Sequence, residues 1–298
     1  MDFFDTLKGI SKRVEKDVPM KNHTSFKIGG CADYVAYPGS IDEIRAIKKL
    51  ADEHNVPVTV VGNGSNLLVS DDGIEGVVIK ISDAMSEVKV EGCEVFAEAG
   101  VLLSTLANRV EKYSLTGLEF ASGIPGTLGG AVVMNAGAYG GEMKDVITSV
   151  GYMTKDGEVI EADAKECGFG YRKSIFSCGD KTVLYCRMSL KEGNRDEIRA
   201  LMNELNQRRK DKQPLSLPSA GSTFKRPEGY FAGKLIEDSG LKGFRVGGAE
   251  VSRKHSGFVV NIDNATAKDV KNLIAEVQRI VFEKFGVNLE PELKFIGR

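Results

Sequence analysis

The chain has 298 residues and a formal net charge of −2 at pH 7, with 42% hydrophobic and 28% charged residues. These proportions are typical of a globular protein, and the absence of repeats and biased tracts excludes a low-complexity chain. No apolar run is long enough to cross a bilayer, so we expect neither a membrane nor, at this charge, a nucleic-acid partner. The length is enough for two or three domains, each with its own core.

Cysteine and histidine are too few for a structural zinc site. The five cysteines are an odd number without a CxxC pair, and there are only three histidines, so we expect no bound metal and reduced thiols. The first 18 residues mix both charge signs and lack the apolar core of a signal peptide, which predicts a cytoplasmic protein. The cysteines are Cys31, Cys93, Cys167, Cys178 and Cys186.

The first strongly predicted helix covers 40–54. Ser40 is its expected N-cap and Glu43 completes a capping box, while apolar residues recur at helical spacing: Ile44, Ile47 and Leu50. An apolar strand at 56–61 follows and ends in a glycine-rich turn. The pattern then predicts four short strands, at 67–69, 76–81, 87–90 and 94–99. A second helix is predicted at 102–113.

The middle of the chain is rich in strands. Segments 147–154, 158–162 and 182–190 are predicted to be antiparallel, with a turn at 155–157 between the first two. A helix is expected to begin near Asn194, with an apolar stripe formed by Ile198, Leu201, Met202 and Leu205. The predicted fold class is therefore α+β.

A charged segment interrupted by prolines, 207–218, is predicted to be a domain boundary. Beyond it we expect a small α/β domain with a helix at 231–239, strands at 245–251 and 258–262, and a strong final helix. Thr266 and Asp269 form a capping box at the start of that helix, and Gly286 ends it. Its apolar stripe is Val270, Leu273, Ile274, Val277, Ile280 and Val281.

Charge is unevenly distributed along the chain. Segment 206–290 has 15 basic and 10 acidic residues, a balance of +5, whereas the remainder has 25 and 32, a balance of −7. This basic third is consistent with attraction of an anionic small molecule, and equally with chance variation of the surface.

Two glycine clusters point to a ligand that carries phosphate. In 123–141, seven of nineteen residues are glycine, and a second cluster occupies 62–66, directly after the strand at 56–61. Glycine at this density suits main-chain amides that must approach a ligand closely, most often a phosphate. For either cluster alone a tight turn is the better interpretation. Together, and with Asn135 adding a side-chain amide, they favour a dinucleotide site.

The spacing of these glycines does not match the common nucleotide-binding motifs. Gly62 and Gly64 are followed by Leu67 rather than by the third glycine of a Rossmann fingerprint. The spacing of the glycines from Gly123 onward is also wrong for that motif, and no Gly-Lys-Ser/Thr follows either cluster, which excludes a Walker loop.

Six segments, in order along essentially the whole chain, resemble the UDP-N-acetylenolpyruvoylglucosamine reductase family. They are NHTSFKIGG at 22–30, VGNGSNLL at 61–68, GLE at 117–119 continuing to 140, YRKS at 171–174, SAGSTFKRP at 219–227 and LEPE at 289–292. The resemblance implies a vanillyl-alcohol-oxidase (PCMH-type) FAD-binding fold of two α+β subdomains, with a small C-terminal α/β substrate-binding domain.

The implied domains are an FAD-binding region at 1–206, with subdomains of about 1–82 and 83–206, and a substrate-binding domain at 207–288. Residues 289–298 would form a strand that returns to the flavin. The family binds FAD without a covalent link and takes hydride from NADPH. The residues implied in cofactor binding are Gly62, Asn63, Gly64, Ser65, Asn66, Gly123, Ile124, Pro125, Gly126, Gly130, Asn135, Ala136 and Gly137.

The implied reaction reduces UDP-N-acetylglucosamine enolpyruvate to UDP-N-acetylmuramate for peptidoglycan synthesis. Hydride reaches the terminal vinyl carbon, so negative charge develops on the carbon that bears the carboxylate. Arg172 matches the family's carboxylate-binding arginine, and a guanidinium suits that task because it remains charged when buried. On the residues alone, a surface salt bridge would be the better explanation of Arg172.

Ser222 matches the family's proton donor, and Glu292 its acidic third member. A charged carboxylate would repel the developing dianion, so Glu292 is expected to be protonated and to donate a hydrogen bond. Glu290 lies two residues away and is the competing assignment, and a capping or turn serine is the alternative for Ser222. Substrate-binding residues implied by the resemblance are Tyr171 and Lys225.

Two departures from the family pattern are visible. After 171–174 the chain soon enters the strand at 182–190, which leaves no room for the inserted loop whose tyrosine closes over substrate in one subclass. The chain thus resembles the shorter, type II subclass. One phenylalanine of the usual Ser-Phe-Phe-Lys signature is replaced by Thr223, which leaves the packing beside Ser222 open.

The histidines have weaker assignments. His23 is expected to make a packing or polar contact rather than a covalent flavin bond, and His54 to cap a helix C-terminus. His255, with Arg253 and Lys254, faces either substrate phosphates or solvent. Two other functions compete with the implied one: an oxidase of the same fold acting on an alcohol or sugar, and a nucleotide sensor without chemistry. We expect a monomer.

Overall fold

The computed structural model describes residues 2–298, which form two compact units. The first unit consists of residues up to 15 together with 34–63 and 76–209, and the second of 16–33, 64–75 and 210–298. Each unit is therefore assembled from three separate stretches of the chain. Within the described residues, no helix combines the length and apolar character needed to span a membrane.

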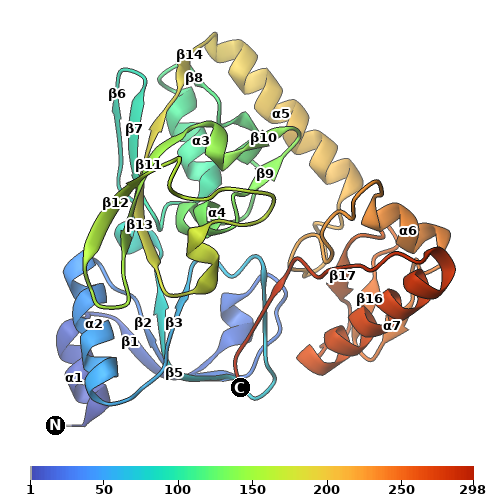
Figure 1. Ribbon diagram of the computed structural model, residues 1–298, viewed down its shortest axis with the longest axis horizontal. Helices are drawn as coiled ribbons and strands as arrows, with labels where there is room; N and C mark the ends of the chain where they lie inside the picture. Colours follow the sequence, from blue (N-terminus) through green and yellow to red (C-terminus); the bar gives the residue numbers. More distant parts are fainter. Residues whose placement is uncertain (1) are drawn as a thin grey trace. The chain divides into compact units, whose positions relative to one another are not determined.

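Near the N-terminus, two helices and a four-stranded sheet share one core (Figure 1). The helices are α1 (Phe3–Ile10) and α2 (Ile41–Glu53), which pack against each other. The sheet has the order β1-β2-β5-β3, in which β3 is parallel to β5. Its strands are β1 (Val14–Pro19), β2 (Cys31–Ala36), β3 (Val58–Val61) and β5 (Ile74–Lys80).

The predicted start of α2 is confirmed, with one difference. The Ser40 side chain accepts a hydrogen bond from the Glu43 N–H at 3.2 Å, as expected of an N-cap. The Glu43 carboxylate, however, accepts from the N–H of Gly39 at 2.9 Å rather than from Ser40. His54 is the C-cap, and its N–H donates to the carbonyl of Leu50.

A five-stranded antiparallel sheet forms the rest of the first unit's framework, in the order β12-β11-β13-β7-β6. The predicted hairpin is confirmed, with Tyr152 opposite Ile160. Helix α3 (Leu103–Glu111) belongs to the same core, and α4 (Leu128–Val133) packs on β13 and β7. The strands are β6 (Val88–Glu91), β7 (Glu94–Glu98), β11 (Ile147–Met153), β12 (Val159–Asp163) and β13 (Thr182–Ser189).

The long glycine-rich stretch contains regular structure that its composition did not predict. It includes helix α4 and a two-stranded hairpin of β9 (Gly137–Ala138) and β10 (Gly141–Glu142). A helix forms despite two glycines because it packs very closely: a Cβ at Gly129 would lie 3.0 Å from the Cβ of Ala99. Tertiary packing thus outweighs the helix-breaking tendency of glycine here.

Helix α5 (Arg195–Lys212) is longer than expected. The sequence predicted a boundary from 207 onward, but Gln, Arg and Lys are good helix formers and no proline occurs before Pro214. The predicted apolar stripe is wrong at Leu201, which is 42% exposed. Two short strands, β8 (Leu115–Thr116) and β14 (Lys191–Glu192), pair antiparallel just before this helix.

The second unit packs α6 (Ala232–Asp238) and α7 (Ala267–Phe285) with a three-stranded sheet. The capping box between Thr266 and Asp269 is present, and Gly286 ends α7 in a left-handed conformation. The strand predicted at 245–251 is instead two strands that turn at Gly247. The strands are β15 (Arg245–Val246), β16 (Ala249–Val251) and β17 (Val259–Asn261).

The C-terminal strand, β18 (Lys294–Ile296), pairs parallel with β4 (Leu67–Val69), so that Lys294 lies opposite Leu67. Glu292 precedes this strand rather than lying within it. Short 3-10 turns complete the chain: η1 (Met20–His23), η2 (Asp83–Met85), η3 (Glu119–Ala121), η4 (Met143–Asp145) and η5 (Ile175–Cys178).

Candidate active site

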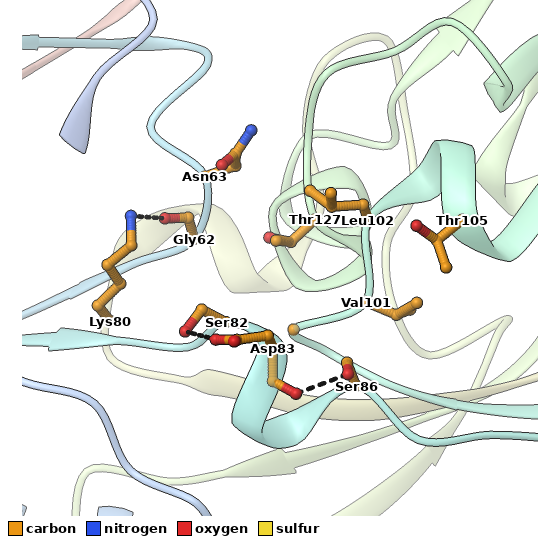
Figure 2. A pocket seen from close by; sticks show the side chains of 11 residues that line it. Gly62, Asn63, Lys80, Ser82, Asp83, Ser86, Val101, Leu102, Thr105 and Thr127 are labelled. Atoms are coloured by element: carbon orange, nitrogen blue, oxygen red, sulfur yellow. Dashed lines mark hydrogen bonds between the residues drawn. The ribbon is translucent and has the colours of Figure 1, made fainter. Parts of the chain in front are cut away.

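A pocket of about 280 Å³ lies within the first unit, beside the end of β3 and the start of α3 (Figure 2). Its lining combines bare backbone at Gly62, an ammonium group, a carboxylate, several hydroxyl groups and two apolar side chains. The side chains that matter here are Asn63, Lys80, Ser82, Asp83, Val101, Leu102 and Thr127.

The two glycine-rich loops meet at this pocket. The Asn63 side chain donates a hydrogen bond to the carbonyl of Pro125 at 2.6 Å. A Cβ at Gly62 would lie 2.2 Å from Oγ1 of Thr127, so only glycine allows this approach without a shift. The structure therefore brings the first two residues of one predicted cofactor loop against the other loop.

The remaining residues of the first loop belong to the second unit. The Gly64 carbonyl accepts from the N–H of Ser25 at 3.2 Å, and a Cβ at Gly64 would lie 2.1 Å from the carbonyl oxygen of His23. His23 thus contributes its backbone to the shape of this loop. The Asn66 side chain donates to the carbonyl of Glu292 at 3.2 Å.

The pocket residues fit a nucleotide cofactor. Unhindered backbone and hydroxyl groups suit phosphate and ribose oxygens, Lys80 supplies positive charge, and Val101 and Leu102 offer apolar surface for a base. The wall is held rigidly, because Leu128 N–H donates to the carbonyl of Val101 at 2.8 Å and Leu103 N–H to that of Gly126 at 3.0 Å.

The side-chain amide of Asn135 is held by hydrogen bonds to other protein groups. Its side chain is fully buried, donates to Glu142 at 2.9 Å and to the Gly170 carbonyl at 3.1 Å, and accepts from Lys144 N–H at 2.9 Å. The sequence suggested that this amide would face a cofactor. Its observed bonds instead make it a support that connects the glycine-rich stretch to the segment leading to Arg172.

Arg172 is half-buried in the first unit and has a left-handed backbone, with φ of 55°. This conformation is uncommon outside glycine and often marks a functional position. The guanidinium donates to the carbonyl of Gly137 at 3.1 Å and lies 5.3 Å from the centre of the exposed Tyr171 ring. Arg172 is thereby oriented by the predicted cofactor stretch.

Ser222 and Glu292 lie on adjacent segments of the second unit. Glu292 N–H donates to the Thr223 carbonyl at 2.8 Å, and Phe224 pairs with Pro291 as an antiparallel bridge. The Ser222 hydroxyl donates to the Phe224 carbonyl at 3.1 Å. The segments that contain two of the three predicted catalytic residues are therefore adjacent, although 70 positions separate Ser222 from Glu292 in the sequence.

The competing carboxylate, Glu290, has a different environment. Its side chain is 70% exposed and forms a salt bridge with Lys225, whereas Glu292 is half-buried. This pairing also occupies the Lys225 ammonium, which the sequence suggested as a substrate contact. The unusual Thr223 is buried, and its hydroxyl accepts a hydrogen bond from Val259 N–H at 2.9 Å, which a phenylalanine could not do.

The region around His255 is held by protein contacts. Its ring packs edge-on against Phe258 at 5.1 Å and accepts from Gly257 N–H at 3.1 Å, and burial lowers the pKa of His255. Arg253 pairs with Glu250 at 3.2 Å, and Lys254 donates to the carbonyl of Lys210 at 2.6 Å.

Two cations beside the glycine loops were not predicted from the sequence. Lys80 ends a buried strand and donates to the carbonyl of Gly62 at 3.3 Å. Arg209 lies in the segment predicted to be a domain boundary and donates to the carbonyl of Gly123. A lysine directly after the apolar run 77–79 was the only signal of the first, and nothing in the sequence indicated the second.

Comparison with known protein families gives two matches. Residues 32–163 match the family model described as FAD binding domain. Residues 213–296 match that described as UDP-N-acetylenolpyruvoylglucosamine reductase, C-terminal domain.

Curated relatives match over nearly their whole length. UDP-N-acetylenolpyruvoylglucosamine reductase of Caldanaerobacter subterraneus subsp. tengcongensis is 55% identical over 295 residues, covering 98% of this chain and 97% of the relative. The protein of that name from Clostridioides difficile is 49% identical over 296 residues, covering 99% and 97%.

Two solved structures have a fold similar to that of this chain. The crystal structure of UDP-N-acetylenolpyruvylglucosamine reductase (MurB) from Thermus caldophilus has a TM-score of 0.82 at 38% identity and covers 95% of this chain and 98% of that one. Physcomitrella patens BBE-like 1 is similar in fold alone, with a TM-score of 0.51, 15% identity, and coverage of 64% and 45%.

The predicted fold class, an FAD-binding region with a small C-terminal domain, is confirmed. By sequence and by fold along its whole length, this chain belongs to the UDP-N-acetylenolpyruvoylglucosamine reductase family.

Proposed function

We propose that this protein reduces UDP-N-acetylglucosamine enolpyruvate to UDP-N-acetylmuramate, a step in the synthesis of peptidoglycan precursors. The observation that carries this conclusion is the match, over 98% of the chain, to relatives named for reduction of that substrate. The pairing of the segments that contain Ser222 and Glu292 supports it, because the implied chemistry needs two proton-bearing groups close together.

FAD is the cofactor, held without a covalent bond, and NADPH is the proposed hydride donor. The matched FAD-binding domain and the nucleotide-compatible pocket support this assignment. When bound, FAD supplies two-electron hydride chemistry. The holding residues would be the two glycine loops, 62–66 and 123–126, with Gly130 and the stretch 135–137 behind them.

The three catalytic residues have distinct proposed roles. Arg172 binds the substrate carboxylate with its fixed cationic fork. As hydride adds to the terminal vinyl carbon, the Ser222 hydroxyl protonates the adjacent carbon, and the serine regains its proton from solvent. Glu292 remains un-ionised and donates a hydrogen bond to the same carboxylate, which lowers the energy of the dianionic transition state. Tyr171 is a proposed substrate contact, and Lys225 would become one by exchanging its salt bridge with the exposed Glu290 for the substrate.

The domain assignment follows the same proposal. Residues 1–206 would contribute the FAD-binding region, 207–288 the substrate-binding domain and 289–298 the returning segment. We propose that the enzyme acts as a cytoplasmic monomer, which sedimentation analysis of the purified protein tests directly.

The visible spectrum provides the decisive experiment. The purified protein should be yellow, should bleach when NADPH is added without oxygen, and should regain its colour with the enolpyruvyl nucleotide. Ser222→Ala should still bleach but should not recover colour with that nucleotide. Recolouring by oxygen together with turnover of an alcohol or sugar, and no response to the enolpyruvyl nucleotide, would instead identify an oxidase. A protein that binds nucleotides but transfers no electrons would be a sensor.

A further inference from the structure

Two half-buried cations in the first unit donate to the carbonyl groups that open the two glycine loops. The Lys80 ammonium lies 3.3 Å from the carbonyl oxygen of Gly62, on the wall of the pocket (Figure 2). The Arg209 guanidinium, in the last turn of α5, donates to the carbonyl of Gly123. The first glycine of each loop thus holds one positive charge.

Neither cation is neutralised by the protein. Within residues 2–298, no carboxylate forms a salt bridge with Lys80 or with Arg209. Asp83 lines the same pocket, but its carboxylate accepts from the Ser82 hydroxyl at 3.0 Å and acts on Lys80 only at longer range. Burial lowers the pKa of both Lys80 and Arg209. Such cations have lost hydration without gaining an opposite charge, which is unfavourable for the protein by itself.

The two cations hold neighbouring loops. The loops they hold are joined by the hydrogen bond from Asn63 to Pro125, and Gly62 approaches Thr127 too closely for any side chain. The amides of these loops carry only partial charge. Neutralising a doubly charged anion at their junction takes two full positive charges. Lys80 and Arg209 supply two that form no salt bridge within the described residues.

We propose that Lys80 and Arg209 are the counter-charges for the diphosphate of the flavin dinucleotide. The inference rests on the proposed function, because it takes FAD as the ligand of these loops. Each cation would exchange part of its bond to a neutral carbonyl for a charge-assisted bond to phosphate, which is the stronger of the two. The glycine carbonyls keep both side chains directed to the loops before the cofactor arrives.

Flavins of different length test this assignment, since riboflavin has no phosphate, FMN has one and FAD has the diphosphate. In titrations of the flavin-free protein, Lys80→Met and Arg209→Met should each weaken FAD binding by about tenfold or more. Their affinity for riboflavin should stay within twofold of the unchanged protein, with FMN in between. The affinity for FAD should also become less sensitive to salt in both variants.

Matched controls separate charge at this site from charge in general. Arg208 precedes Arg209 on α5, is exposed and pairs with Glu204, and Lys49 is 78% exposed on α2. Arg208→Met and Lys49→Met should leave the affinity for FAD within twofold. Lys80→Arg and Arg209→Lys keep the charge and should retain most of the affinity.

Stability gives an independent readout. Lys80→Met removes a half-buried ammonium that has no carboxylate partner within the described residues. The melting temperature of this variant without flavin should therefore be unchanged or higher than that of the unchanged protein, although its affinity for FAD falls. A structural role predicts the opposite: a lower melting temperature and equal weakening of FAD and riboflavin. Either that pattern or unchanged FAD affinity in both variants would overturn the inference. A protein that binds no FAD at all would refute the proposed function first, so the two failures are distinguishable.

Discussion

The N–H of Glu292 donates to the carbonyl of Thr223 at 2.8 Å, which places the last acidic residue of the chain beside the segment that contains Ser222. The same pairing directs Glu290, two residues earlier, to an exposed salt bridge with Lys225. The two acids thus have different environments: Glu290 is an exposed surface carboxylate in a salt bridge, whereas Glu292 is half-buried.

This difference predicts different effects of the same substitution at the two acids. Glu292→Gln should slow turnover of the enolpyruvyl nucleotide by about 10²-fold or more, because the un-ionised acid is a specific donor to the developing charge. Glu290→Gln should stay within about twofold, because exposed ion pairs contribute little. Steady-state kinetics of both variants provides the measurement, and equal losses would contradict the assignment of Glu292.

Thr223 provides a second prediction, on stability. Its buried hydroxyl accepts a hydrogen bond from the N–H of Val259 at 2.9 Å. Thr223→Val retains the shape but leaves that N–H unpaired, at a cost of about 1–3 kcal/mol in the free energy of unfolding. Thr223→Ser keeps the hydroxyl and should lose less. Chemical denaturation of the two variants tests this, and a smaller loss for valine than for serine would refute it.

A third prediction concerns pH. Burial alone would raise the pKa of Glu111, but its hydrogen bonds from Arg199 and Arg195 outweigh burial and lower that pKa. A lowered pKa in the folded state stabilises the protein above the unfolded value of about 4.3 and loses that contribution as pH falls through the folded value. Between about pH 5 and 3, the free energy of unfolding should therefore fall less steeply in Glu111→Gln than in the unchanged protein.

The matched measurement is a series of urea denaturations across that pH range. At pH 7 Glu111→Gln should be the less stable protein, and the two stability curves should converge in acid. Parallel curves would show that the two arginines do not lower the pKa of Glu111.

The fourth prediction separates two reasons for glycine at Gly64. This residue has φ of 67°, and a Cβ there would lie 2.1 Å from the carbonyl oxygen of His23. Gly92 has a similar φ of 61°, but a Cβ there would meet nothing within 4 Å. Gly92→Ala should cost only the backbone strain, about 1–2 kcal/mol, whereas Gly64→Ala adds a clash with main chain and should cost clearly more.

Thermal denaturation of flavin-free Gly64→Ala and Gly92→Ala compares these costs directly. Gly64→Ala should also weaken FAD binding, since its loop must shift, while Gly92→Ala should not. Similar melting temperatures for the two variants would mean that the loop at Gly64 is more adaptable than the structure indicates.

Local patterns in the sequence were sufficient wherever a structural feature depends on residues a few positions apart. The caps of α2 and α7 and the β11–β12 hairpin follow from such patterns. The family resemblance, carried by six short segments, also predicted the fold that the comparisons confirm.

Features that depend on packing between distant segments were decided only by the tertiary structure. Composition argued against a helix at 128–133, yet close contact with Ala99 stabilises one. The helix α5 continues through a segment that looked like a linker, and this extension is what delivers Arg209 to Gly123.

By itself, therefore, the sequence determined most of the long helices and strands, the fold family and the residue types at the candidate site. It could not determine that, among the described residues, no carboxylate forms a salt bridge with Lys80 or Arg209, or that Glu290 rather than Glu292 is paired with Lys225. The physical reason is that the energy of a charge depends on its burial and on its partners. Both are properties of segments far apart in the chain, which only folding brings together.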